Sequence, residues 1–242
     1  MSPQISSSLR IFSILLLALP FAPQGLAQEG YLGRWAAAVG GREKIAAVRS
    51  TYREATIQVA GVEGTIKAWH TSDGKYRKEE RIASYSVVEV FDGTNGTVQK
   101  GTGPVQKMSE PEVRRAISTA YANWNAVFFA FFPERRHGKL DVESDGTIVL
   151  RPEGGIEWRV TLDRQTSLPK VMEHKEGDRT VTVTFVSYET VDGIPFEKEI
   201  RRTNGDPRFD AVIRFTKTVI NPPADPSLFS VDLGKAGAAM DR

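Results

Sequence analysis

The sequence contains no cysteine. A chain without cysteine forms no disulfides, has no thiol chemistry and offers no thiolate ligand to a metal ion. It also lacks the N-terminal cysteine on which a bacterial lipid anchor is built. We therefore expect the mature product to be soluble and untethered.

Histidine is scarce, and recognisable catalytic motifs are missing. His70, His137 and His174 are scattered without metal-ligand spacing, and His174 is expected on an exposed strand. No serine lies in a nucleophile elbow, and Gly101-Thr102-Gly103 lacks the strand-to-helix context of a phosphate-binding loop. We predict no catalytic residue, no metal and no cofactor, so the chain is not expected to be an enzyme. Acid–base pairs contributed by distant strands would escape such a search.

A large excess of charge is absent as well. The 32 Lys and Arg residues and 30 Asp and Glu residues leave a formal net charge of +2. Most charged residues alternate in sign, as in 78–81 and 197–199, which predicts solvated faces. Nucleic acid is therefore not an expected partner.

Hydrophobic runs long enough to span a bilayer are missing too. The apolar run Ile11–Leu19 follows the cation Arg10 and precedes the small residues Gly25-Leu26-Ala27. Such a run is too short for about 30 Å of hydrocarbon, and the pattern is typical of a secretory signal peptide over residues 1–27. An uncleaved anchor is the alternative. Residues 28–242 show no linker or repeat, which predicts a single domain.

Beyond residue 50 the hydrophobic pattern has the period of β-strands. Ala55, Ile57 and Val59 alternate with polar residues, and Ile156–Leu162 behaves in the same way. Asp-Gly and Asn-Gly turns punctuate these runs, as in an antiparallel meander. We predict a mainly β (α+β) fold, a single curled antiparallel sheet or incomplete barrel of about 10 or 11 strands. A helical entry, Glu29–Val48, is expected to break at Gly40-Gly41 and to plug one end of the sheet.

One long helix is predicted in the middle of the chain, from Ser109 to Pro133. Ser109 and Glu112 have the spacing of a capping box, and Pro111 falls in the first turn. Apolar residues recur at helical spacing from Val113, and four phenylalanines then cover most of the helix circumference before Pro133. A helix end that is apolar all round must be covered by other parts of the protein.

The helix and the strands together supply a large apolar surface. It forms either a dry core or a groove for an apolar ligand, with the helix as a movable lid. Each buried methylene of such a ligand contributes about 0.8 kcal/mol. The predicted ligand-binding residues are Val113, Ile117, Tyr121, Trp124, Phe128, Phe131, Phe132, Trp158, Val160, Ile213 and Phe215.

Several short motifs, taken in order, resemble those of the periplasmic lipoprotein-sorting proteins, LolA-like and LolB-like. The matching motifs are a hairpin with Gly64, Asp73-Gly74-Lys75-Tyr76-Arg77, Phe91-Asp92-Gly93, Leu168-Pro169, Val191-Asp192-Gly193-Ile194-Pro195-Phe196, and 219–225 followed by Leu228-Phe229. The resemblance implies an incomplete barrel closed by helices around a cavity for acyl chains. One departure is that Trp69-His70-Thr71-Ser72 stands where the family's carrier has the arginine that holds its lid shut.

The favoured function at this level is a soluble periplasmic carrier of lipid, or of the acyl chains of lipoproteins, towards the outer membrane. Its expected partners are a lipid or an acylated protein, with envelope proteins possible in addition, and the chain is expected to be a monomer. One alternative is an envelope sensor or interaction module whose core is filled by its own aromatic residues. A third is an envelope hydrolase, which two carboxylates or a His–carboxylate pair in the cavity would favour.

Overall fold

The computed structural model of the protein describes residues 24–121, 138–223 and 225–233. The second half of the predicted mid-chain helix and most of the predicted signal peptide lie outside these ranges. In the described part no helix is long and apolar enough to cross a membrane. The first helix, α1 (Gln24–Ala38), begins before Ala27, so cleavage there would remove only its first residues.

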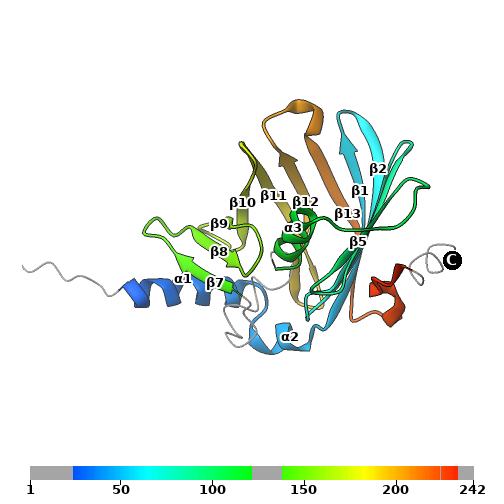
Figure 1. The fold of residues 1–242 in the computed structure, drawn as a ribbon. Coiled ribbons are helices and arrows are strands. Elements are labelled where there is room, and N and C mark those ends of the chain that lie inside the picture. The colour runs from blue at the N-terminus through cyan, green and yellow to red at the C-terminus, as the bar shows by residue number, and fades with distance from the viewer. Residues whose placement is uncertain (1–23, 122–137, 224, 234–242) are drawn as a thin grey trace, which may run out of the picture.

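A single antiparallel sheet of 13 strands forms the body of the molecule (Figure 1). Its first strands in the chain are β1 (Ser50–Val59), β2 (Val62–Thr71), β3 (Tyr76–Ile82), β4 (Tyr85–Phe91), β5 (Gly96–Lys100) and β6 (Gln106–Lys107). The later strands are β7 (Gly138–Val142), β8 (Ile148–Pro152), β9 (Trp158–Leu162), β10 (Pro169–Glu176), β11 (Arg179–Val191), β12 (Ile194–Thr203) and β13 (Ala211–Ile220).

The fold class predicted from the sequence is confirmed, but the predicted number of strands is too low. One reason is β6, a strand of two residues that is too short to show an alternating pattern. The strand order is β6-β5-β4-β3-β2-β1-β13-β12-β11-β10-β9-β8-β7. The edge strands β6 and β7 do not pair with each other, so the curled sheet stays open.

The first and last strands of the chain meet at the centre of the sheet, because β1 pairs with both β2 and β13. Asn221 fastens this junction just after β13. Its side-chain oxygen accepts hydrogen bonds from the backbone N–H groups of Arg49 (2.7 Å) and Ser50 (3.2 Å), and its amide nitrogen donates to the carbonyl of Ala47 (2.9 Å). The ends of the domain are therefore held at the same place where the two halves of the sheet join.

The helical entry breaks as predicted, into α1 and α2 (Arg42–Ala47), with Gly40 and Gly41 at positive φ between them. Both helices lie at the bottom of the sheet in the view of Figure 1, and α1 contacts β7. Their apolar residues enter the main core, whose buried members are Leu32, Trp35, Val39, Ile45, Val48, Tyr121, Leu140, Ile148, Leu150, Val160, Met172 and Ile194. The plug predicted for this end of the sheet is therefore present.

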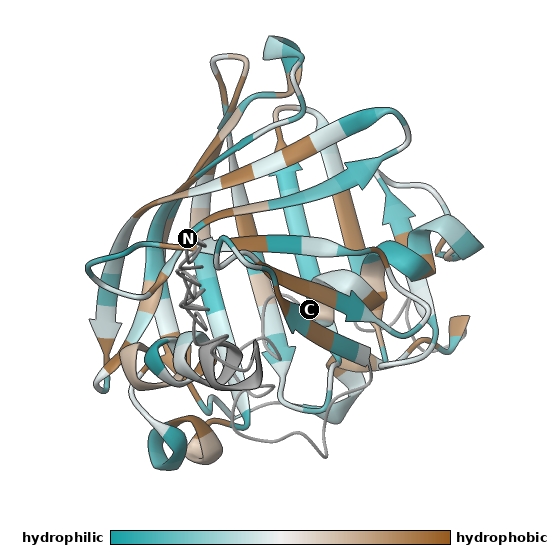
Figure 2. Cartoon of the chain, turned by 90° about the vertical axis from the view of Figure 1, so that its left-hand side faces the viewer, coloured by the Kyte–Doolittle hydropathy of each residue, from teal (hydrophilic) through white to brown (hydrophobic). Residues whose placement is uncertain are grey.

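The two faces of the sheet follow from the strand register, because residues directly opposite each other point to the same side. His70 and Tyr76 pair across β2 and β3, and Arg53, Ala68 and Lys78 form the next row on that same face. This face is concave and carries the mid-chain helix. Hydrophobic and hydrophilic residues alternate along the strands, as Figure 2 shows.

The opposite, convex face is covered at one place by a short 3-10 helix, η4 (Pro226–Phe229), which contacts β3 and β4. Phe229 is buried there, so the docking predicted for Leu228-Phe229 is confirmed at Phe229. Arg77 and Val90 are opposite each other and are buried on the convex face. A second 3-10 helix, η3 (Pro207–Phe209), lies between β12 and β13.

The mid-chain helix, α3 (Glu110–Ala120), lies inside the curve of the sheet (Figure 1). Its start agrees with the prediction, because the Glu112 carboxylate accepts from both the backbone N–H and the hydroxyl of Ser109, each at 2.8 Å. Ala116 and Ala120 are buried against Tyr76 and Phe91 of the concave face. The small alanines allow the helix to approach the aromatic rings closely.

Candidate functional site

An apolar chamber of about 310 Å³ lies between α3, the concave face of the sheet and the α1–α2 plug. Residues from all three elements line it: the helices contribute Trp35, Val39, Ile45, Val48 and Thr119, and the strands and their connections contribute, among others, Ile66, Ala68, Trp158, Leu168, Met172, Phe185, Ile194, Phe196, Ile200, Ile213 and Phe215. Its size is at the lower end of the range for small-molecule sites, about 300–1,000 Å³.

The predicted ligand-binding residues fall into four groups in the structure. Trp158, Ile213 and Phe215 line the chamber. Val113 and Ile117 belong to α3 and are partly buried against the cluster of Tyr76 and Phe91. Tyr121 and Val160 are buried in the main core. The remaining four, which are Trp124, Phe128, Phe131 and Phe132, lie outside the described residues.

The chamber also contains a charged residue that the sequence reasoning missed. Arg53 on β1 forms an ion pair with Glu197, with 2.6 Å between Nη1 and Oε2, and its guanidinium lies 3.4 Å from the ring centroid of Phe215. Only 11% of the Arg53 side chain is exposed. Arg53 continues the apolar alternation of Ala55 and Ile57 by one step towards the N-terminus, so a cation on an apolar face was a signal present in the sequence.

The Arg53–Glu197 pair corrects the reading of residues 197–199 as a solvated face. Glu197 lines the chamber, and its carboxylate balances the guanidinium in an apolar setting. A buried pair of this kind gains little net stability, but removal of one partner leaves an uncompensated charge. The Arg53–Glu197 ion pair therefore places charged groups in a mainly apolar lining.

His70 also lines the chamber, together with the charged residues Arg53, Lys78 and Glu197. Burial, assisted by the positive charges of Arg53 and Lys78, lowers the pKa of His70 to about 4. The imidazole is therefore neutral at physiological pH. Its neutral state avoids a further positive charge beside Arg53 and Lys78.

A second space of about 420 Å³, here called the vestibule, adjoins the chamber beside α3. The two spaces share the residues Tyr76, Lys78, Thr119, Trp158 and Val183. The rest of the vestibule lining is largely polar and charged and includes Glu89, Lys100, Glu112, Arg115, Ser118, His174, Glu176 and Arg202. The apolar chamber and the polar vestibule therefore share a boundary, which includes Thr119 of α3.

His174 was predicted on an exposed strand, and this prediction is wrong. The residue is 9% exposed, because its ring packs on Trp158 of the neighbouring strand with 4.1 Å between centroids. Its Nε2 lies 3.1 Å from the Glu176 carboxylate. The sequence shows the charged neighbours of His174, but only the strand register shows that Trp158 lies opposite it.

The His174–Glu176 pair is the type of arrangement that a hydrolase would need, so its other ring nitrogen matters. Nδ1 is buried and has no hydrogen-bond partner among the described residues. The nearby Ser118 hydroxyl is already engaged, since it accepts from the backbone N–H of Ile156 and lies 3.0 Å from the carbonyl oxygen of Arg114. A nucleophile–base–carboxylate series is therefore not assembled here.

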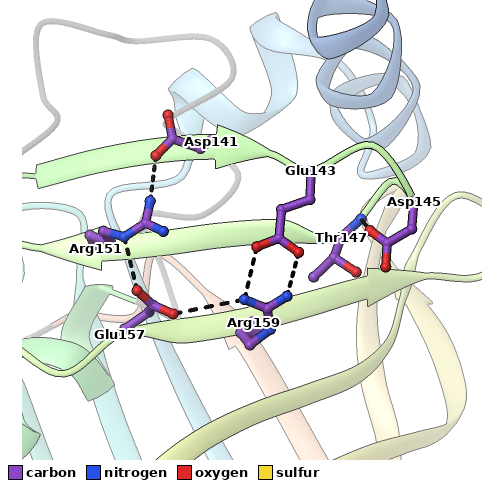
Figure 3. Close-up of polar contacts among 7 residues, drawn as sticks. All are labelled: Asp141, Glu143, Asp145, Thr147, Arg151, Glu157 and Arg159. Carbon is purple, nitrogen blue, oxygen red and sulfur yellow. Dashed lines mark hydrogen bonds and ion pairs between the residues drawn. The ribbon is translucent and has the colours of Figure 1, made fainter.

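The β7–β9 hairpins, which form the far end of the sheet, carry a ladder of ion pairs on their outer surface (Figure 3). Arg151 pairs with Asp141 and Glu157, and Arg159 pairs with Glu143 and Glu157. All five side chains are about half exposed, so the ladder is a solvent-accessible surface network. Among the described residues no group of three or more His, Asp or Glu side chains could hold a metal ion.

Comparison with known proteins places the fold. No protein-family profile matches the chain, and no curated protein matches it in sequence. Solved structures do match. One is a DUF1329 family protein from Desulfovibrio piger, with a TM-score of 0.53 and 12% identity over 84% of this chain and 97% of that protein.

Two further solved structures have a fold similar to that of this chain. A putative outer membrane lipoprotein-sorting protein domain from Vibrio parahaemolyticus has a TM-score of 0.51 and 11% identity over 87% of this chain and 99% of that domain. A LolA superfamily protein from Nitrosomonas europaea has a TM-score of 0.53 and 10% identity, and the match covers 85% of this chain and 98% of that protein. The resemblance predicted from the sequence is thus confirmed at the level of the fold, which is LolA-like.

Proposed function

We propose that the protein is an exported, periplasmic binding protein that carries a lipid, or the acyl chains of a lipoprotein, in the apolar chamber. The single observation that carries this proposal is the chamber itself, an apolar space of about 310 Å³ inside a LolA-like sheet. Its lining supplies aromatic and aliphatic surface for a hydrocarbon chain. At about 0.8 kcal/mol for each buried methylene, even part of an acyl chain gains enough free energy for carriage.

The volume favours one chain over several. It lies at the lower end for small-molecule sites, so the described chamber suits one acyl chain rather than the several chains of a mature lipoprotein.

The docked position of α3 bears on whether the helix can act as a lid, because Ala116, Ser118 and Ala120 are all buried. A lid motion of this helix would have to break those contacts.

The test is the binding of an uncharged fluorescent apolar probe, N-phenylnaphthylamine, to the purified mature protein. Ile213→Gln places a polar amide in the chamber, whereas Val212→Gln changes the adjacent residue, whose side chain is on the convex face. We expect Ile213→Gln to weaken binding about tenfold and Val212→Gln to leave it unchanged. Displacement of the probe by dodecanol is expected for the wild-type protein.

Absence of probe and dodecanol binding by the wild-type protein would contradict the carrier function. It would favour the alternative, an envelope interaction module with a filled core. Equal weakening by Ile213→Gln and Val212→Gln would show that the probe does not occupy the chamber. Thermal unfolding of both variants serves as the control for folding.

A further inference from the structure

The vestibule is lined by more positively than negatively charged side chains, and the contacts of each side chain show which cations are in excess. Four cations, Lys78, Lys100, Arg115 and Arg202, face three carboxylates, Glu89, Glu112 and Glu176. Each carboxylate has a partner. Glu89 forms an ion pair with Lys78 (3.5 Å) and Glu112 with Lys100 (3.6 Å). The Glu176 carboxylate lies 3.1 Å from Nε2 of His174, and this contact is a hydrogen bond to a neutral ring, so the four cations exceed the three carboxylates by one charge.

The two arginines are left over from this pairing. Arg115 and Arg202 have no ion pair within 4.0 Å among the described residues of the vestibule, and both are exposed to solvent. They come from opposite walls, since Arg115 belongs to α3 and Arg202 to β12. Burial lowers the pKa of the His174 imidazole, and the positive charges of Arg202 and Arg115 lower it further, whereas Glu176 raises it. Both arginines line the vestibule together with His174.

The strand register explains why Arg202 faces inward. Arg202 is opposite Val183 on β11, and Val183 is opposite Met172 on β10. All three share the concave face with Ala211 of β13, so Arg202 stands within an apolar row, and Val183 and Met172 of that row line the chamber. Its neighbour Arg201 points to the convex face.

We propose that the vestibule binds the anionic headgroup of a single-chain amphiphile through Arg115 and Arg202, while the hydrocarbon chain of the same molecule lies in the apolar chamber. The proposal rests on the carrier function above and names the class of its ligand. A carboxylate or phosphate matches guanidinium groups, which bind oxyanions with paired N–H donors. The shared boundary at Thr119 and Trp158 is where the chain would pass from one space to the other.

The experiment compares ligands that differ only in the headgroup. Displacement of N-phenylnaphthylamine is measured at neutral pH with dodecanoate, dodecanol and dodecylamine. We expect dodecanoate to bind about tenfold more tightly than dodecanol, and dodecylamine to bind more weakly than dodecanol. Inorganic phosphate is added to the dodecanoate titration, and it is expected not to displace the amphiphile, because phosphate alone lacks a chain for the chamber.

The chain offers a matched control, since each arginine has a neighbouring arginine that points elsewhere. Arg115→Gln with Arg202→Gln removes the two vestibule charges, whereas Arg114→Gln with Arg201→Gln removes the same amount of charge outside the vestibule. We expect the first double variant to bind dodecanoate and dodecanol equally, and the second to keep the tenfold preference. All four side chains are exposed, so both variants are expected to fold.

Several outcomes would overturn the headgroup proposal and leave the carrier function standing. They are equal binding of dodecanoate and dodecanol by the wild-type protein, an unchanged preference in the first double variant, and displacement of dodecanoate by inorganic phosphate. Loss of the preference in the control variant would also overturn it, because general charge would then be the cause. Failure of dodecanol itself to bind would overturn the carrier function and the headgroup proposal together.

Discussion

The hydroxyl of Ser118 on α3 accepts a hydrogen bond from the backbone N–H of Ile156, in the loop between β8 and β9. Ser118 is 1% exposed, so this contact is shielded from water. It joins the mid-chain helix to the far end of the sheet, 38 residues further along the chain. The helix is therefore fixed at both ends of its described length, by Ser118 here and by the Ser109–Glu112 cap at its start.

Ser118→Ala removes the acceptor of the Ile156 N–H and leaves that buried donor unpaired. We expect the free energy of unfolding to fall by about 1–3 kcal/mol. Urea unfolding of the mature protein measures it. Ser84→Ala, at an exposed position in the β3–β4 turn, is the control and should change stability by less than about 0.5 kcal/mol. Equal effects of the two substitutions would show that Ser118 does not fasten the helix.

Gly155 lies beside the same contact. A Cβ at this position would come within 2.6 Å of the Ser118 hydroxyl and 3.0 Å of Pro152. Gly155→Ala is therefore expected to lower the free energy of unfolding by about 1–3 kcal/mol through overpacking.

Gly33→Ala is the control, because Gly33 lies in α1 with nothing within 4 Å of an added Cβ. Gly33→Ala should raise the stability by about 0.5–1 kcal/mol. Thermal or urea unfolding measures the change in the free energy of unfolding for both variants. A Gly155→Ala protein as stable as the wild type would contradict the close packing at this loop.

Substitutions of two neighbouring residues of β8 compare how much core packing and surface charge contribute to the free energy of unfolding. Leu150 is fully buried, and Leu150→Ala is expected to cost about 2–5 kcal/mol. Arg151 belongs to the exposed ladder of Figure 3, so Arg151→Gln is expected to cost less than about 1 kcal/mol. The Arg151→Gln effect should shrink further in high salt, whereas the Leu150→Ala effect should not. Urea unfolding at low and high salt tests both, and a large, salt-insensitive effect of Arg151→Gln would contradict the surface role.

The chamber is expected to make stability depend on pH through His70. Its pKa in the folded protein is lowered from 6.5 to about 4 by burial and by the charges of Arg53 and Lys78. Between these pH values the unfolded chain binds a proton that the folded chain does not. The free energy of unfolding should therefore fall as the pH drops from about 6.5 to about 4, by at most about 3 kcal/mol.

The measurement compares urea unfolding at pH values across that window for the wild-type protein and His70→Gln. The variant has no imidazole to protonate, so its stability should fall less steeply in the same window. Carboxylates contribute equally to both proteins and cancel in the difference. Parallel curves for the two proteins would show that His70 is not held neutral in the chamber.

The sequence by itself determined the elements of this protein, because their signals are local. Alternation along Ala55–Val59 and the Asp-Gly and Asn-Gly turns predicted an antiparallel sheet, and Ser109 with Glu112 predicted where the mid-chain helix begins. The break at Gly40-Gly41 was equally visible, since positive φ favours glycine. The order of such motifs was also enough to suggest the LolA-like fold.

Tertiary structure decided which charged residues face inward. Glu197 and His174 stand beside charged neighbours in the sequence, which predicted solvent exposure, yet the strand register places Glu197 in the chamber beside Arg53 and His174 against Trp158. Register depends on pairing between strands far apart in the chain, and no local pattern encodes it. For the same reason the sequence predicted an apolar surface around Trp158, Ile213 and Phe215, but only the fold showed that a polar vestibule with two unpaired arginines adjoins it.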